Sequence, residues 1–203
     1  MRESFVEELV DQFMTRDENK PHEPGLRAIV QVYRTAAEEG RKVEESAELT
    51  ELGKREAMKR SLSTAYTSLK PHEKAVEHLA DKLAATRSKA LRRPAATPET
   101  LAVEREIRDR LVAAKADPVT VSAKYFSAID RGDNAFVGAV ENAPASFPLL
   151  SSMDREKGEA AKLEQSPLAY LIAEQEAEFD LFDQIIRMTE TQLGKLKVVT
   201  PSG

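Results

Sequence analysis

The chain has 203 residues, of which 41% are hydrophobic, 32% are charged and 5% are aromatic, and it contains no cysteine. The lack of cysteine excludes disulfide scaffolds, iron–sulfur clusters and thiol catalysis within this chain. Its 8 glycines and 10 prolines are too few for the many turns of a loop-rich β-sandwich, so long uninterrupted elements are expected.

The formal net charge is −5, from 30 basic and 35 acidic residues, and the acidic surplus lies in the second half of the chain. Residues 164–190 carry seven acidic side chains and a single base, Arg187, which makes them a poor surface for phosphate backbones. We find no apolar run of the signal-peptide type at the N-terminus and no window with the character of a membrane span. The expected location is the cytoplasm, or a particle assembled there.

Residues 4–16 are predicted to form an amphipathic helix. Ser4 followed by Glu7 has the spacing of a capping box, which satisfies free backbone N–H groups at a helix start. The large apolar side chains recur on one helical stripe. They are Phe5, Val6, Leu9, Val10, Phe13 and Met14.

Residues 17–24 contain Pro21, Pro24 and no large apolar side chain, so they are expected to be a solvated linker. The preceding helix would then be an arm that docks either on its own chain or on another subunit, and both alternatives stay open. The acidic side chains on its polar face make a membrane-surface role the weaker reading.

A second helix is predicted to begin near Pro24. Residues 38–48 include Gly40 and are either a solvated extension of that helix or a loop. A third helix is predicted from Thr50 to about Arg92, with seam residues spaced alternately by four and three positions, the heptad rule of coiled coils. Pro71 lies inside it, so the helix must kink or restart there. The seam comprises Met58, Leu62, Ala65, Leu69, His72, Val76, Leu79, Leu83, Thr86 and Ala90.

Four start signals predict shorter helices at 98–114, 118–131, 133–143 and 151–164. These signals are Thr97-Pro98, Asp117-Pro118, Asp133, and Ser151 with Asp154. Gly132 should end one helix just before the next begins, which makes a tight helical hairpin. The expected apolar residues of the first two helices are Leu101, Val103, Ile107, Leu111, Val112, Val119, Tyr125, Phe126 and Ile129.

The proline-broken segment 144–150 is expected to be extended, and so are the final residues Val198, Val199 and Thr200. Between them, a last long helix starts at Ser166 and carries a second heptad seam. This seam comprises Leu168, Ile172, Gln175, Phe179, Phe182, Ile186, Thr189, Leu193 and Leu196.

The predicted fold is therefore all-α: an elongated helical bundle with long coiled-coil-like helices and a central helical hairpin. Four segments are expected. They are an N-terminal amphipathic arm and linker (1–24), a long-helix region (25–93), a short-helix hairpin region (94–150) and a C-terminal long helix with its tail (151–203).

The sequence offers no constellation for catalysis or for a cofactor. The three histidines, His22, His72 and His78, lack the i, i+4 spacing that chelates zinc on a helix, so no metal site is expected. Phosphate-loop, dinucleotide-binding and nucleophile-elbow patterns are also missing. We therefore expect the protein not to be an enzyme and to need no cofactor.

Five bases without an intervening acid lie near the end of the third helix. They are Lys82, Arg87, Lys89, Arg92 and Arg93. The helix dipole favours cations at that end without any ligand. A nucleic-acid contact is the less favoured alternative, because no aromatic side chain is interleaved to stack on bases.

Part of the sequence resembles uncharacterised helical proteins encoded by tailed phages. The resemblance is carried by residues 104–111 (Glu-Arg-Glu-Ile-Arg-Asp-Arg-Leu), Tyr125, Ala128, Gly132-Asp133 and residues 139–144, with a further similar segment at 49–54. It implies a virion or assembly role and transfers no functional residue.

The expected function is that of a non-enzymatic structural or assembly protein, as in a phage virion, acting through helical protein–protein contacts. Its partners would be other protein subunits, in a homo-oligomer or a larger assembly, with no membrane involved. The alternatives are a DNA-associated factor using the basic run, or a helical adaptor or chaperone. The residues expected to make protein contacts are the six apolar residues of the N-terminal arm together with Phe179, Phe182 and Ile186.

Overall fold

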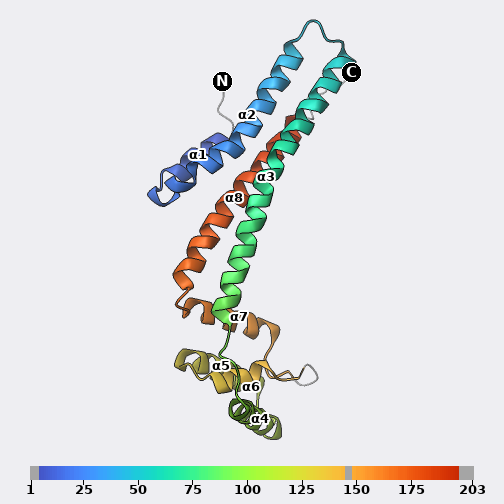
Figure 1. Ribbon diagram of the computed structural model, residues 1–203. Coiled ribbons are helices and arrows are strands. Elements are labelled where there is room, and N and C mark those ends of the chain that lie inside the picture. Colours follow the sequence, from blue (N-terminus) through green and yellow to red (C-terminus); the bar gives the residue numbers. More distant parts are fainter. Residues whose placement is uncertain (1–4, 145–147, 197–203) are drawn as a thin grey trace. The chain divides into compact units, whose positions relative to one another are not determined.

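The structure is a computed structural model, and it describes residues 5–144 and 148–196 (Figure 1). Among these residues every regular element is a helix and no strand is formed, which confirms the all-α prediction. The elements are α1 (Phe5–Met14), the 3-10 helix η1 (Asp17–His22), α2 (Glu23–Glu45), α3 (Glu51–Leu91), α4 (Pro98–Ala113), α5 (Pro118–Arg131), α6 (Asn134–Glu141), α7 (Ser152–Glu164) and α8 (Ala169–Leu196). The Ser4 cap, most of the tail and the middle of segment 144–150 lie outside the described residues.

The chain divides into two compact units rather than into the four expected segments. The first, here called the long-helix unit, comprises residues 1–82 and 174–203, and the second, here called the inserted unit, comprises residues 83–173. The long-helix unit therefore takes its residues from both ends of the sequence.

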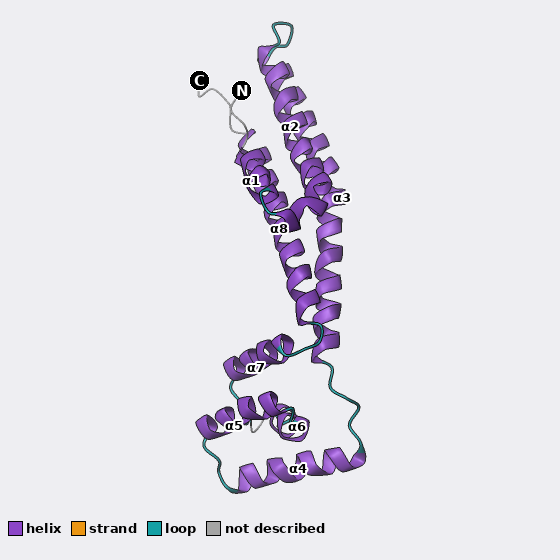
Figure 2. Ribbon diagram, turned by 90° about the vertical axis from the view of Figure 1, so that its left-hand side faces the viewer, coloured by secondary structure: helices purple, strands orange, loops and turns teal. Residues whose placement is uncertain are grey.

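In the long-helix unit, α2 and α3 form an antiparallel pair, and α8 runs beside α3 in the opposite direction (Figures 1 and 2). The predicted seam of α3 is buried in the core at Leu62, Ala65, Leu69 and Val76. On α8 the buried face is wider than the predicted seam, because Leu181 and Ile185 are buried as well as the seam residues Ile186, Thr189 and Leu193. A wide apolar face is what a helix needs when it packs against more than one neighbour.

Residues 38–45 are a helical extension and not a loop, because α2 continues through Gly40 to Glu45. Gly40 is buried, and a Cβ atom at this position would lie 3.0 Å from Met58 Cε on α3. The missing side chain therefore leaves room for Met58 where the two helices pass each other.

Pro71 neither folds α3 back nor restarts it, since α3 is one helix of 41 residues with Pro71 inside it. At 1.5 Å per residue this helix is about 60 Å long. The Pro71 ring is exposed, so the missing N–H and the crowded preceding turn are tolerated on the outer face.

Replacing Pro71 with alanine should therefore raise the free energy of unfolding by about 1 to 3 kcal/mol, because alanine restores a helical hydrogen bond and removes the ring clash. Urea denaturation of the full chain measures this difference. Lys74→Ala, also exposed and in the next turn of α3, serves as the control and should change stability by less than about 0.5 kcal/mol. A Pro71→Ala variant that is less stable than wild type would show that the proline stabilises the folded protein at this position.

The prediction of a solvated linker is wrong, since residues 17–22 form η1 and α2 begins at Glu23. Asn19 Nδ2 donates a hydrogen bond of 3.0 Å to the Phe13 carbonyl oxygen at the end of α1. His22 Nδ1 lies 3.6 Å from Glu178 Oε1 of α8, and its ring contacts Phe182 edge to face, with 5.9 Å between the ring centroids. These contacts turn the segment into a tight connection between α1 and the helices beside it.

The N-terminal helix docks on its own chain. Val6 and Val10 are 0% and 1% exposed in the core of the long-helix unit. Leu9, Phe13 and Met14 are partly buried against the same core, as are Phe179 and Phe182 of α8, while Ile186 is buried within it. Asp11 Oδ1 also accepts a hydrogen bond of 3.2 Å from Arg27 Nη2 of α2. Of the two alternatives left open by the sequence, the structure has this helix packed on the core of the long-helix unit of its own chain. The Phe5 side chain lies outside what the structure describes.

The inserted unit is a cluster of short helices in which α6 lies against α4 and α5, and α7 against α5. The predicted caps are confirmed: the side chains of Thr97, Asp117, Asp133 and Ser151 each accept a hydrogen bond from the backbone N–H three residues later. Gly132 has φ +68°, the left-handed conformation that ends α5, so the predicted helical hairpin is also confirmed. The core comprises Val121, Tyr125, Ala128, Ile129, Val137, Val140, Leu149 and Leu150.

Candidate functional site

Helix α4 buries a carboxylate and exposes apolar side chains. Glu104 is 4% exposed, whereas Leu101 is 52% exposed, and Val103 and Val112 are exposed too. The expectation that all the apolar residues of this helix face the core is therefore wrong for three of them. The inward face is set by Glu104 together with the partly buried Ile107 and Leu111.

Further large apolar side chains of the inserted unit lie at its surface. Val119, expected to be buried, is 76% exposed, and Tyr170 is 82% exposed. Together with the three residues of α4 they form a set that we call the surface apolar residues of the inserted unit. The set comprises Leu101, Val103, Val112, Val119, Met153, Tyr170 and Leu171.

A polar cluster lies where α4 meets α6. Arg93 Nη1 is 3.5 Å from Glu104 Oε1, and Asn142 Nδ2 donates a hydrogen bond of 3.1 Å to Glu104 Oε2. A Cβ atom at Gly138 of α6 would lie only 2.5 Å from Glu104 Cδ. Glycine is therefore the residue that lets α6 approach the buried carboxylate.

Glu141, the last residue of α6, is the second centre of this network. Its Oε1 accepts hydrogen bonds from the Tyr125 hydroxyl at 2.5 Å and from Lys162 Nζ at 2.6 Å. Its carbonyl oxygen accepts one from Arg155 Nη1 at 3.0 Å, and the next carbonyl accepts one from Arg108 Nη1 at 3.0 Å. Cations at the carbonyl end of a helix are favoured by the helix dipole. Burial, and then the bond to Glu141, raises the pKa of the Tyr125 phenol, so this hydroxyl stays a donor in the folded protein.

A pocket of about 210 Å³, here called the cationic pocket, lies within the inserted unit beside this network. Three of its lining residues are cations, Arg92, Arg93 and Lys162, and none is acidic. The other lining residues are Ala90, Leu91, Pro94, Ala128, Ile129, Gly132, Asn134, Val137 and Gln165. An enclosure with this lining is suited to an anionic group.

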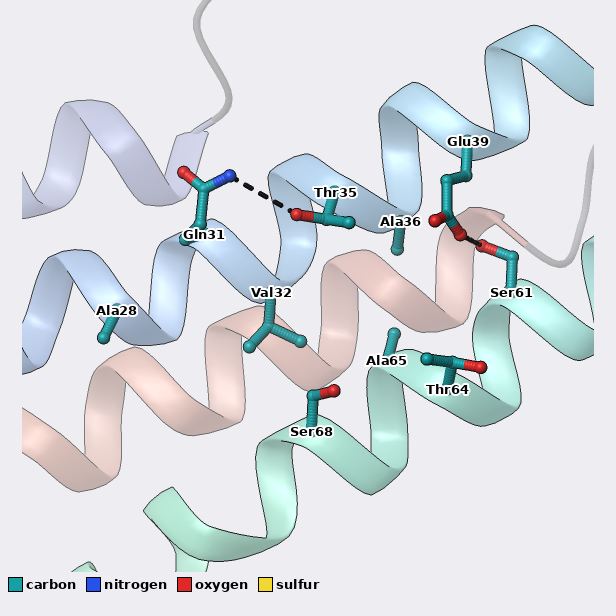
Figure 3. A pocket seen from close by; sticks show the side chains of 10 residues that line it. All are labelled: Ala28, Gln31, Val32, Thr35, Ala36, Glu39, Ser61, Thr64, Ala65 and Ser68. Carbon is teal, nitrogen blue, oxygen red and sulfur yellow. Dashed lines mark hydrogen bonds between the residues drawn. The ribbon is translucent and has the colours of Figure 1, made fainter.

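The long-helix unit carries a smaller hollow of about 180 Å³ between α2 and α3 (Figure 3). Alanine, serine and threonine make up most of its lining, and Glu39 is its one titratable side chain. Glu39 Oε2 already accepts a hydrogen bond of 2.7 Å from Ser61 Oγ across the hollow. The hollow therefore offers close packing and no evident chemistry.

The structure separates the five residues of the basic run. Arg93 is turned toward Glu104, while Lys82 and Arg87 each have an interaction within the chain. Lys89 and Arg92 are exposed, and of the five only Arg92 and Arg93 line the cationic pocket. The run is therefore not a continuous row of free cations of the kind that a phosphate backbone would contact.

Across the described ranges, no group of three or more histidine, aspartate or glutamate side chains is arranged to hold a metal ion. None of the helices described is both long enough and apolar enough to cross a membrane.

Sequence reasoning missed most of the polar network: Glu104, Glu141, Asn142, Lys162 and the part played by Tyr125. One signal was available, because Glu104 falls on the same helical stripe as Ile107 and Leu111, at spacings of three and seven. The partner Asn142 is 38 residues away in the sequence, and no local pattern connects the two.

Comparisons with known proteins bring no relative to this chain: no protein-family model, no curated protein and no solved structure matches it.

Proposed function

We propose that the protein is a non-enzymatic structural or assembly protein that binds other protein subunits through surfaces of the inserted unit. The observation that carries this proposal is the set of surface apolar residues of the inserted unit. In the long-helix unit, by contrast, the large apolar side chains described as exposed are Leu49 and Leu52 alone. Exposed apolar side chains that adjoin one another on a surface are typical of protein–protein contacts.

The proposed contact surface lies on the inserted unit, whereas the sequence indicated the N-terminal arm and the last long helix. The described apolar side chains of the arm and the α8 seam residues Phe179, Phe182 and Ile186 pack in the core of the long-helix unit. On α4, Leu101 and Val112 are eleven residues apart, close to three helical turns, so they lie on the same side of the helix. This side is the one that we expect to contact a partner subunit.

The finer assignment, to a phage virion assembled in the cytoplasm, is supported by the resemblance of residues 104–111 and 139–144 to tailed-phage proteins. These segments lie in the inserted unit, on α4 and around the end of α6. Mass spectrometry of purified particles tests this assignment, and absence of the chain from them would exclude a virion component.

The double variant Leu101→Ser and Val112→Ser should shift the wild-type oligomer toward monomer, because it removes apolar area from the proposed contact. Size-exclusion chromatography with light scattering, at several protein concentrations, measures the mass. Leu52→Ser, which changes an exposed leucine of the long-helix unit, is the control and should leave the mass unchanged. A wild-type chain that is monomeric at every concentration would contradict self-association through this surface.

A further inference from the structure

We propose that the cationic pocket of the inserted unit binds a small oxyanion, a phosphate or a carboxylate group, with Arg92 as its principal donor. This inference does not depend on the proposed subunit contacts.

The lining of the cationic pocket is positively charged. Arg92 and Arg93 are adjacent in the sequence and Lys162 is distant from them, and the fold brings all three to one pocket without an acidic lining residue. The nearest carboxylates in the network, Glu104 and Glu141, pair with Arg93 and Lys162 but do not line the pocket. One positive charge, that of Arg92, is left without a carboxylate to balance it.

Several hydrogen-bond donors at the cationic pocket have no acceptor within the described residues. Among the described residues, the Arg92 guanidinium makes no hydrogen bond or ion pair. Arg93 uses one nitrogen on Glu104, at 3.5 Å, and Lys162 uses one of its three N–H groups on Glu141. An arginine has five N–H donors and a lysine three, so most of the donors at this pocket remain available. An oxyanion supplies several acceptors at once and can accept two parallel N–H hydrogen bonds from one guanidinium.

Two of the cations at the pocket are held in place by carboxylates of the polar network. Glu104 is buried and is fixed by Asn142, while Glu141 is bonded to both Tyr125 and Lys162. These carboxylates keep Arg93 and Lys162 positioned at the pocket before any ligand arrives, which lowers the entropic cost of binding.

The pocket is small and is lined partly by apolar side chains. Ala128, Ile129 and Val137 line it with apolar surface, and a low local dielectric strengthens charged hydrogen bonds. Asn134 and Gln165 add side-chain amides, and Gln165 uses one N–H on Asp130 at 3.0 Å. A volume of about 210 Å³ is below the range of drug-sized ligand sites, so it suits a small anionic group.

The experiment titrates inorganic phosphate, and separately acetate, into the isotopically labelled full chain at constant ionic strength, with chloride as the reference anion. The side-chain amide signals of Asn134 and Gln165 in two-dimensional NMR spectra report binding. We expect a saturable shift of both signals. Stronger binding of phosphate supports a phosphorylated ligand and stronger binding of acetate a carboxylate ligand, and both results support the oxyanion site.

Arg92→Gln should weaken this binding about tenfold, since it removes a charged bidentate donor. Arg92→Lys should give an intermediate loss, because it keeps the charge without the planar fork. Lys89→Gln is the matched control: it removes an exposed base three residues away that does not line the pocket, and its affinity should stay within about twofold of wild type. Arg92 is exposed and unpaired among the described residues, so its variants should keep the wild-type melting temperature.

Three results would overturn the proposal. The first is the lack of a saturable shift with either anion. The second is equal affinity in wild type and Arg92→Gln, and the third is an equal loss in Lys89→Gln, which would indicate charge screening without a pocket.

Discussion

Replacing Gly158 with alanine should lower the stability of the inserted unit by about 2 to 3 kcal/mol. Gly158 is buried on α7, and a Cβ atom there would lie 2.7 Å from Tyr125 Cζ. The Tyr125 ring is 0% exposed and rigid, so it cannot swing into solvent to make room. Moving the ring would also stretch its hydrogen bond to Glu141, which links α5 to the end of α6. The usual gain in helix propensity from glycine to alanine, about 1 kcal/mol, is smaller than the overpacking that results.

Thermal and urea unfolding of the full chain would measure the loss, with near-ultraviolet circular dichroism reporting the surroundings of the tyrosines. Gly194→Ala is the matched control, since this glycine is also helical and, apart from its own stretch of helix, nothing lies within 4 Å of the added Cβ; it should be neutral or slightly stabilising. The double variant Gly158→Ala with Tyr125→Leu should lose less stability than the sum of the two single variants, because the coupling between the two positions is steric. Equal stability of Gly158→Ala and wild type would rule out the close packing of α7 on Tyr125.

Replacing Val10 with aspartate should detach α1 from the long-helix unit and leave α2, α3 and α8 folded. Val10 is 1% exposed, and a carboxylate at that depth without a partner costs several kcal/mol. The docking of α1 rests mainly on Val6 and Val10, whose burial contributes about 1.5 to 3 kcal/mol each. A helix of 10 residues has little stability in water once it is undocked.

Hydrogen exchange of the backbone amides of residues 5–14 measures the detachment, and protection should be lost in this segment only. Gln12→Asp is the matched control, because it adds the same charge to the exposed face of the same helix and should keep protection close to wild type. Unchanged protection in Val10→Asp would show that α1 is held by some other face. Protection that rises with wild-type protein concentration would instead show that α1 docks on a second copy.

Helix boundaries were predictable wherever the signal is local. Thr97, Asp117, Asp133 and Ser151 were each expected to start a helix, and each accepts the capping hydrogen bond from three residues ahead. The end of α5 at Gly132 was predictable for the same reason, since glycine readily adopts the left-handed conformation that ends a helix, and this preference is local.

Predictions failed where distant contacts decide the structure. Residues 17–24 lack the apolar side chains that normally mark a packed segment, yet Asn19 and His22 hold them through polar and ring contacts. Val119 and Leu101 fit helical apolar patterns, but the inward faces of α5 and α4 are chosen by Tyr125 and Glu104, which pack on α6 and α7. Composition could not indicate that a buried glutamate would replace an apolar side chain.

The division of the chain has a consequence for synthesis on the ribosome. All of residues 83–173 emerge before the part of α8 that supplies Leu181, Ile185 and Leu193 to the core that α1, α2 and α3 begin. The inserted unit therefore has its whole sequence available for folding at that stage of synthesis. The long-helix unit still lacks that part of α8, which forms one side of its core. Premature termination before α8 would leave the apolar faces of the earlier helices uncovered and open to aggregation or proteolysis.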